Sequence, residues 1–271
     1  MLMMADLLRR SARLHLAMRD VLDGAKLWPL WGKLGWNDIL QRYRRSFLGP
    51  FWLTVSMAVM VIALGIVYSQ IFKTPINDFM PFLCLGLLIW NFINTVLNNA
   101  GALFTGAESY VKQIRLPYSI YLYRFIWSNV IVFAHNAVIY LGVMIYYEVW
   151  PETFLYAIPG LLLLVLNGAL ASLYIGIISA RFRDIPQIIV SLTQIAFYVT
   201  PIIWKPEILG SRSAILLFNP FHHLIEIVRG PLLGQLPSLE SYTAVGIITA
   251  VNLAAAAAFF IRFRARISYW V

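Results

Sequence analysis

The chain has 271 residues, of which 61% are hydrophobic and 12% charged, whereas soluble domains contain roughly 45–50% apolar and about 25% charged residues. This composition excludes a water-soluble globule, because it leaves too little polar surface, and it indicates a protein that uses lipid as its solvent. The formal net charge of +9 would suit nucleic-acid binding, but its distribution along the chain gives it another meaning.

The N-terminal segment, residues 1–50, interleaves charged residues with leucines, and its pattern is not that of a secretory signal peptide. Residues 3–22 are weakly amphipathic, which fits a frayed surface helix as well as a docking element. Residues 35–47 carry apolar side chains at helical spacing, with polar and basic ones on the rest of the surface. This pattern is typical of a helix in the membrane interface whose arginines reach lipid phosphates. The residues predicted for this interface helix are Trp36, Arg42, Tyr43, Arg44 and Arg45.

Six apolar stretches without acidic residues or lysine follow, at 51–72, 79–103, 125–147, 154–180, 187–204 and 242–261. Each reaches the length of about 17–25 residues that a transmembrane helix needs. In lipid they must be helical, because unpaired backbone groups would find no water. We expect Pro201 to kink or end the fifth stretch. The sequence therefore predicts an all-α integral membrane protein with six transmembrane helices, in which residues 51–271 form one membrane domain.

Lysine and arginine are unevenly distributed among the segments that flank these stretches. Of the 21 basic residues, 17 lie in the N-terminal segment, near 104–124, at 181–186 and in the C-terminal tail, and 4 lie in the other connections. Positive residues accumulate on the cytoplasmic side of membrane proteins. We therefore predict that both termini are cytoplasmic. Topology accounts for most of the positive charge, and we expect no nucleic-acid partner.

The sequence contains no evident source of energy for transport. The six stretches contain no Asp or Glu, although ion-coupled carriers usually place ionisable groups inside the bundle. A phosphate-binding loop of the form G-x-x-x-x-G-K-[ST] is also absent from the sequence. The chain is therefore either passive or driven by a separate subunit.

Two sets of residues inside the stretches recur at helical spacing. Asparagines recur on the second stretch; they could contact a polar substrate, but hydrogen bonding between helices is favoured. Small residues recur on the fourth stretch, a pattern that is typical of close helix packing. These residues are Asn91, Asn94 and Asn98, and Gly168, Ser172 and Gly176.

The fifth stretch is expected to present one polar face. A polar face in lipid must look at protein or water, so it either lines an aqueous path or is buried against a neighbouring helix. Asp184 is expected to cap this helix, with Pro186 in the first turn. The polar face consists of Gln187, Ser191, Gln194 and Tyr198, at i, i+4, i+7 and i+11.

The long connection at 205–241 contains a helix signature. Asn219 is expected to cap a helix that Pro220 opens and that Gly230 and Pro231 close. Glu226 and Arg229 are expected to pair at i, i+3. His222, His223 and Glu226 have a spacing that a metal could use, but they occupy a single helical turn, so we predict no metal site.

Five segments resemble, in order and position, the type-2 ABC exporter permeases for polysaccharides. They are RYRRSFLGPFW at 42–52, ESYVKQIRLP at 108–117, RFRDIPQIIVSLTQIAFYVTPIIW at 181–204, NPFHHLIEIVRGPLLG at 219–234, and the tail RFRARISYWV. The resemblance covers about residues 35–271. Within that group the chain looks most like the O-antigen (Wzm-type) permeases, and permeases for capsule and teichoic acid share the pattern.

The resemblance implies roles for three groups of residues. The loop at 108–117 would carry a short coupling helix that contacts an ATPase subunit through Glu108, Tyr110, Lys112 and Arg115; the alternative is a solvated loop. The first and fifth spans would line a channel, with Trp52, Ser56, Ser191, Gln194 and Tyr198 as candidates. A re-entrant pair of helices between spans five and six would close the outer end, with Asn219, His222, Glu226 and Arg229 as the outer gate.

The resemblance also implies partners and location. The chain would form a homodimer in the bacterial inner membrane, bind two copies of an ATP-binding cassette ATPase, and move an undecaprenyl-linked polysaccharide outward. ATP and Mg²⁺ would be bound by the ATPase subunit, and this chain would bind no cofactor or metal and have no catalytic residues. The alternatives are a drug or small-lipid exporter of the same superfamily and a membrane-embedded lipid-linked glycosyltransferase. Such an enzyme should show clustered carboxylates or histidines near a membrane face, and the acidic residues of this chain are scattered.

Overall fold

The computed structural model describes residues 2–42, 44, 49 and 51–271, and within these ranges the regular secondary structure is entirely helical. The α-helices are α1 (Leu2–Lys26), α2 (Trp28–Arg42), α3 (Phe51–Ile71), α4 (Ile76–Asn99), α5 (Ala102–Thr105), α6 (Glu108–Gln113), α7 (Ser119–Tyr146), α8 (Ala157–Arg181), α9 (Ile185–Val199), α10 (Pro220–Leu232), α11 (Leu239–Phe263) and α12 (Ile267–Trp270). Three 3₁₀ segments are η1 (Phe154–Tyr156), η2 (Pro206–Phe218) and η3 (Arg264–Arg266).

Five of the six predicted spans coincide with helices that are long and apolar enough to cross a membrane, at Phe51–Ile71, Ile76–Asn99, Ser119–Tyr146, Phe154–Arg181 and Leu239–Trp270. The chain is therefore a multi-pass membrane protein. The helix at the predicted fifth span, α9 (Ile185–Val199), is shorter than that prediction. It has 15 residues and is therefore about 22 Å long. It ends at Val199, with Thr200 already extended before Pro201, since residues that precede proline disfavour the helical conformation.

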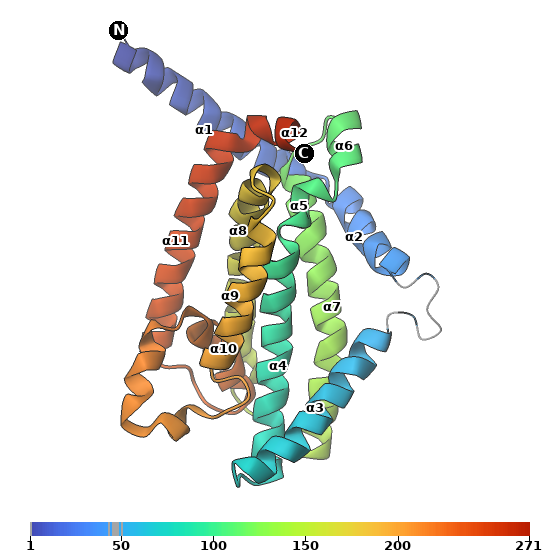
Figure 1. The fold of residues 1–271 in the computed structure, drawn as a ribbon, viewed down its shortest axis with the longest axis vertical. Helices are drawn as coiled ribbons and strands as arrows, with labels where there is room; N and C mark the ends of the chain where they lie inside the picture. Colours follow the sequence, from blue (N-terminus) through green and yellow to red (C-terminus); the bar gives the residue numbers. More distant parts are fainter. Residues whose placement is uncertain (1, 43, 45–48, 50) are drawn as a thin grey trace.

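Helix α4 is the centre of the bundle. Its side chains are buried almost without interruption from Phe79 to Ile93, and it packs against α3, α7, α8, α9 and α10. Figure 1 shows α4 between α9 on one side and α3 on the other. A helix that is apolar all round is typical of such a central position.

The two ends of the bundle differ in what they carry. Both chain termini, α6 and α12 lie at one end, and η2 and α10 lie towards the other (Figure 1). We call the first the basic end, because its segments contain most of the lysines and arginines. The second is the opposite end.

Two glycines of α8 permit close helix contacts. A Cβ at Gly176 would lie 2.9 Å from Cβ of Leu103 in α5, which confirms the small-residue packing predicted for this helix. A Cβ at Gly160 would lie 2.2 Å from the carbonyl oxygen of Ile227. Only glycine therefore lets α10 lie directly against the backbone of α8.

The N-terminal segment differs from its prediction. The helix predicted at 35–47 begins earlier, at Trp28, and forms α2, which packs along α7. Trp36 is exposed on this helix, whereas Ile39 is buried. Arg42 is the last residue of α2 and Arg44 lies in a turn, while Tyr43 and Arg45 lie outside the described residues.

Candidate functional site

Helix α6 stands at the basic end and makes few contacts with the rest of the bundle (Figure 1). Its two charged residues pair across one turn, with Lys112 Nζ 2.6 Å from Glu108 Oε1. The hydrogen bond and the charge of Lys112, with a smaller contribution from Arg183, lower the pKa of Glu108 below its usual value. Both side chains are about half exposed, so α6 presents a charged surface to solvent.

Helix α6 is shorter than the segment in which the coupling helix was predicted. It ends at Gln113, and Arg115, a predicted ATPase contact, lies exposed in the segment that leads to α7. Tyr110 lies within α6, and the position of its side chain is not described.

The predicted polar face of α9 is exposed. Gln187, Ser191, Gln194 and Tyr198 all reach the surface of the chain, and Tyr198 is 68% exposed. The helix contacts the bundle through its other side, where Thr193 and Ala196 are buried. Asp184 stands at the N-cap without a side-chain hydrogen bond to the helix, so the capping bond predicted for it is absent.

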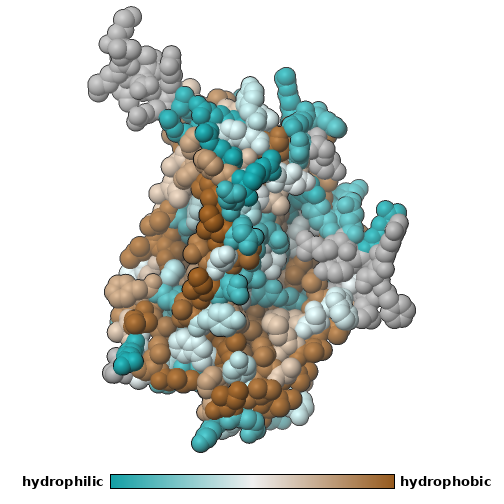
Figure 2. All heavy atoms as spheres, in the orientation of Figure 1, coloured by the Kyte–Doolittle hydropathy of each residue, from teal (hydrophilic) through white to brown (hydrophobic). Residues whose placement is uncertain are grey.

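Asn98 of α4 bonds to the buried side of α9, which is opposite the polar face. Thr193 Oγ1 of α9 donates to Asn98 Oδ1 over 3.0 Å, and Asn98 Nδ2 donates to Asn94 Oδ1 over 2.9 Å. Bonding between helices, the favoured prediction, is therefore confirmed for Asn98. In Figure 2 a hydrophilic band runs from the basic end to the middle of the face that α4 and α9 share, with apolar atoms on its flanks.

The candidates on α3 are exposed but lie apart from that band. Trp52 and Ser56 are on the surface of the chain, and Ser56 Oγ donates to the carbonyl oxygens of Trp52 and Leu53 over 2.8 and 3.0 Å. Helix α3 begins on the side of α4 away from α9 (Figure 1). A single chain therefore presents these two sets of candidates on different sides of α4.

Asn219 connects the end of α9 to the start of α10. Its side-chain oxygen accepts from the backbone amides of Phe221 and His222 over 3.0 and 3.2 Å, which confirms the predicted cap. Its Nδ2 donates to Thr200 Oγ1 over 3.0 Å and to the carbonyl oxygen of Val199 over 3.2 Å. Gly230 and Pro231 were predicted to close α10. The helix instead includes both residues and continues to Leu232.

Arg229 is the most deeply buried charged residue of this region, at 1% exposure. Its Nε donates to Glu226 Oε1 over 3.0 Å, which confirms the predicted pair, and its Nη1 donates to the carbonyl oxygen of Pro201 over 2.8 Å. Its guanidinium also lies over the ring of Phe82 in α4. His222 is half-buried on the same helix. The predicted outer-gate residues are thus grouped where α9, α10 and α4 meet.

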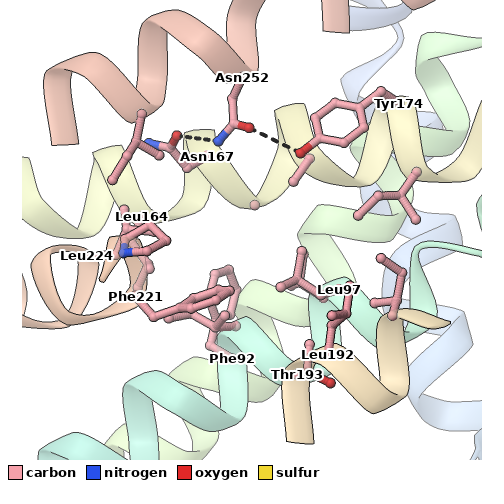
Figure 3. Close-up of a pocket in the computed structure, with 18 residues that line it drawn as sticks. Phe92, Leu97, Leu164, Asn167, Tyr174, Leu192, Thr193, Phe221, Leu224 and Asn252 are labelled. Carbon is pink, nitrogen blue, oxygen red and sulfur yellow. Dashed lines mark hydrogen bonds between the residues drawn. The ribbon is translucent and has the colours of Figure 1, made fainter. Parts of the chain in front are cut away.

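A cavity of about 440 Å³ opens between α4, α8, α9, α10 and α11. On its α8 and α11 side, Asn252 Nδ2 donates to Asn167 Oδ1 over 2.9 Å and Tyr174 OH donates to Asn252 Oδ1 over 3.1 Å (Figure 3). Asn167 Nδ2 also donates to Thr249 Oγ1 over 2.8 Å. These polar groups thus satisfy one another. Most of the other side chains that line the cavity, such as Phe92 and Leu224, are apolar.

One ion pair at the basic end was missed by the sequence analysis. Asp20 Oδ2 of α1 accepts from Nε of Arg264 in the C-terminal tail over 2.6 Å, although the two residues are separated by 244 positions. In the sequence, Asp20 stands out only as an acidic residue among the apolar and basic residues of the weakly amphipathic segment 3–22. No local pattern identifies its partner.

The comparisons with known proteins agree on one family. The family model for ABC-2 type transporters matches residues 30–233. The O-antigen export system permease protein RfbA of Myxococcus xanthus is 24% identical over 229 residues, which cover 83% of this chain and 88% of the relative. An O-antigen export system permease protein RfbA of Klebsiella pneumoniae is 21% identical over 228 residues, with 80% and 86% covered.

Proposed function

Since this chain belongs to the ABC-2 type transporter family, we propose that it is the permease subunit of an exporter for a lipid-linked polysaccharide of the O-antigen type. The observation that carries this proposal is the match to O-antigen export permeases over most of both chains. It is supported by the long apolar helices, which suit a membrane subunit. Permeases for capsule and teichoic acid share the sequence pattern, and loss of one of those polymers in place of the O-polysaccharide ladder would identify it as the substrate instead.

Energy would come from a separate ATP-binding cassette subunit that binds ATP and Mg²⁺. The family implies such a partner, and this chain has no glycine-rich phosphate loop. We propose that the basic end faces the cytoplasm, in accord with the positive-inside rule, and that α6 enters the ATPase subunit. Support comes from the exposed Glu108 and Lys112 on a helix with few intramolecular contacts.

The path for the polysaccharide would lie along the hydrophilic band of α4 and α9. An exposed polar face is unfavourable in lipid, so Gln187, Gln194 and Tyr198 need a cover other than lipid. A second copy of the chain, related by a two-fold axis, would enclose the band as a polar path. Amide and hydroxyl groups beside an aromatic ring suit a sugar chain, because they offer hydrogen bonds and stacking without fixed charge.

The opposite end would close this path between transport events. We propose that α10, held by Asn219 and Arg229, forms the outer gate together with the segment after α9. Support comes from the bonds of both residues to the Val199–Pro201 connection. A rearrangement that opens the gate would have to break or shift these bonds.

Deletion of the gene in its bacterial host tests this function. For a permease, the O-polysaccharide ladder should disappear from the cell surface while complete polymer accumulates on its undecaprenyl carrier inside the cell. A glycosyltransferase would instead leave the carrier without finished polymer. A drug or small-lipid exporter would leave the ladder intact. Either of these last two results would overturn the proposal.

A further inference from the structure

A cleft of about 780 Å³ lies at the basic end between α1 and α6. Helix α6 is the candidate coupling helix, whereas residues 1–34 have no assigned role. The cleft has one wall from each helix: Leu16, Arg19 and Asp23 come from α1, and Lys112, Ile114 and Arg115 come from α6 and the residues after it. The two helices therefore border the same opening.

Asp20 forms the floor of this cleft and is 3% exposed. Its carboxylate accepts from the backbone amides of Ser119 and Tyr118 over 2.9 and 3.1 Å, at the N-terminus of α7. It also accepts from Nε of Arg264 over 2.6 Å. The carboxylate thus satisfies amides that a helix start leaves without partners, and it neutralises the arginine of the tail.

The contact between α1 and α7 is a close one. Ser119 Oγ donates to the carbonyl oxygen of Asp20 over 2.6 Å, and a Cβ at Gly24 would lie 2.1 Å from Ser119 Oγ. The residues just before α7 connect it to α6. Asp20 therefore fixes α1 to the segment that leads out of the coupling helix.

The surface of α1 has three faces at 100° per residue. The buried face holds Ala17, Asp20 and Gly24. Exposed apolar side chains occupy a second face: Leu14, Met18, Val21 and Leu22. The cleft side chains lie roughly opposite this second face. A helix of this kind can lay its apolar stripe in the membrane interface while the cleft stays open to the cytoplasm.

We infer that the cleft docks the ATPase subunit, so that α1 and α6 together form the docking surface, and that Asp20 is the positioning residue that holds α1 in place. This inference rests on the proposed function, and it adds α1 to the ATPase docking surface as a second wall beside α6. Leu16 and Ile114 are 49% and 50% exposed and suit an apolar side chain of the partner. Around the cleft, Arg19, Lys112 and Arg264 pair with acidic residues of this chain. The exposed Arg115 suits an acidic group of the ATPase subunit beside that apolar side chain.

Photo-crosslinking in membranes that contain the assembled exporter tests the two walls. The photoreactive amino acid benzoylphenylalanine replaces Leu16, Ile114 or, as the control on the apolar stripe, Met18. We expect ATPase adducts from positions 16 and 114, and at least tenfold less from position 18. Adducts from 114 without any from 16 would overturn the second wall and leave the proposed function standing. The absence of adducts from both positions would contradict ATPase docking at this end altogether.

Asp20→Asn and Arg264→Gln test the positioning role, with Asp184→Asn as the control, because Asp184 is exposed and its side chain makes no capping bond. We expect the adduct from position 16 to fall at least fivefold in Asp20→Asn while the adduct from 114 persists. ATP hydrolysis by the complex should continue while export falls. Arg264→Gln leaves the bonds of Asp20 to Ser119 and Tyr118 in place and should give a smaller loss, which covers the case in which Asp20→Asn does not accumulate. Unchanged adducts from position 16 would overturn the role of Asp20.

Discussion

The guanidinium carbon of Arg229 lies 4.1 Å from the centre of the Phe82 ring, which places a buried positive charge of α10 against α4. The same guanidinium bonds to Glu226 and to the carbonyl oxygen of Pro201. One side chain thus joins α4, α10 and the segment after α9, and the proposed outer gate depends on it.

Replacement of Arg229 should therefore destabilise the protein strongly. In Arg229→Gln, Glu226 loses its partner in a largely buried site and the carbonyl of Pro201 loses a donor, so we expect a loss of about 3 kcal/mol in the free energy of unfolding. Unfolding in detergent, followed by helical circular dichroism, measures this loss. Arg212→Gln is the matched control, because Arg212 is exposed in η2; equal effects of the two changes would contradict the anchoring role.

A methyl group at position 160 should push α10 away from α8. In Gly160→Ala the new Cβ would meet the carbonyl oxygen of Ile227 at 2.2 Å, and overpacking of this kind costs about 1–3 kcal/mol. A thermal melt of the purified protein should show the loss. Gly142→Ala, where nothing lies within 4 Å of the new Cβ, should leave the melt unchanged or raise it slightly. If both variants behave alike, the close approach of the two helices is wrong.

Charge replacement on the coupling segment should uncouple the exporter without unfolding it. Alanines at Glu108, Lys112 and Arg115 remove exposed charges and little packing, so the protein should still insert into membranes. Export should fail, and less ATPase subunit should be recovered in a pull-down on the permease. Normal export by this triple variant would mean that the loop is only solvated.

The polar face of α9 should be accessible to water in the assembled exporter. In a Cys84→Ser background, Gln194→Cys and Tyr198→Cys should react with membrane-impermeant thiol reagents. Ile195→Cys and Val199→Cys should be protected by lipid or packed protein, because adjacent residues point about 100° apart on a helix. Ala196→Cys is the buried control. Labelling of 195 and 199 without 194 and 198 would place the path on the other side of α9.

Much of the fold could be predicted from the sequence because lipid makes hydrophobic length directly informative. The first predicted span, 51–72, and the helix Phe51–Ile71 differ by a single residue, and the cap at Asn219 followed from its local sequence. The apolar stretch at 187–204 continues past the end of α9 at Val199, and the expectation that Pro201 would kink or end this helix is confirmed.

The contacts that hold the candidate sites could not be predicted in the same way. Asp20 and Arg264 meet only when α1 and the tail converge on α7, and no local pattern contains that information. Arg229 was predicted as one half of an i, i+3 pair. Its burial follows from the return of α10 into the bundle, which brings Phe82 and Pro201 to it.

Reconstituted transport tests the central claim most directly. Vesicles that contain this chain, its ATPase subunit and undecaprenyl-linked polysaccharide should transfer the polymer to the opposite face, where an added glycosidase can digest it, only when Mg-ATP is present on the ATPase side. Vesicles with this chain alone should neither transfer polymer nor hydrolyse ATP, because the sequence has no phosphate-binding loop. ATP hydrolysis by the purified chain alone, or transfer without the ATPase subunit, would contradict the account.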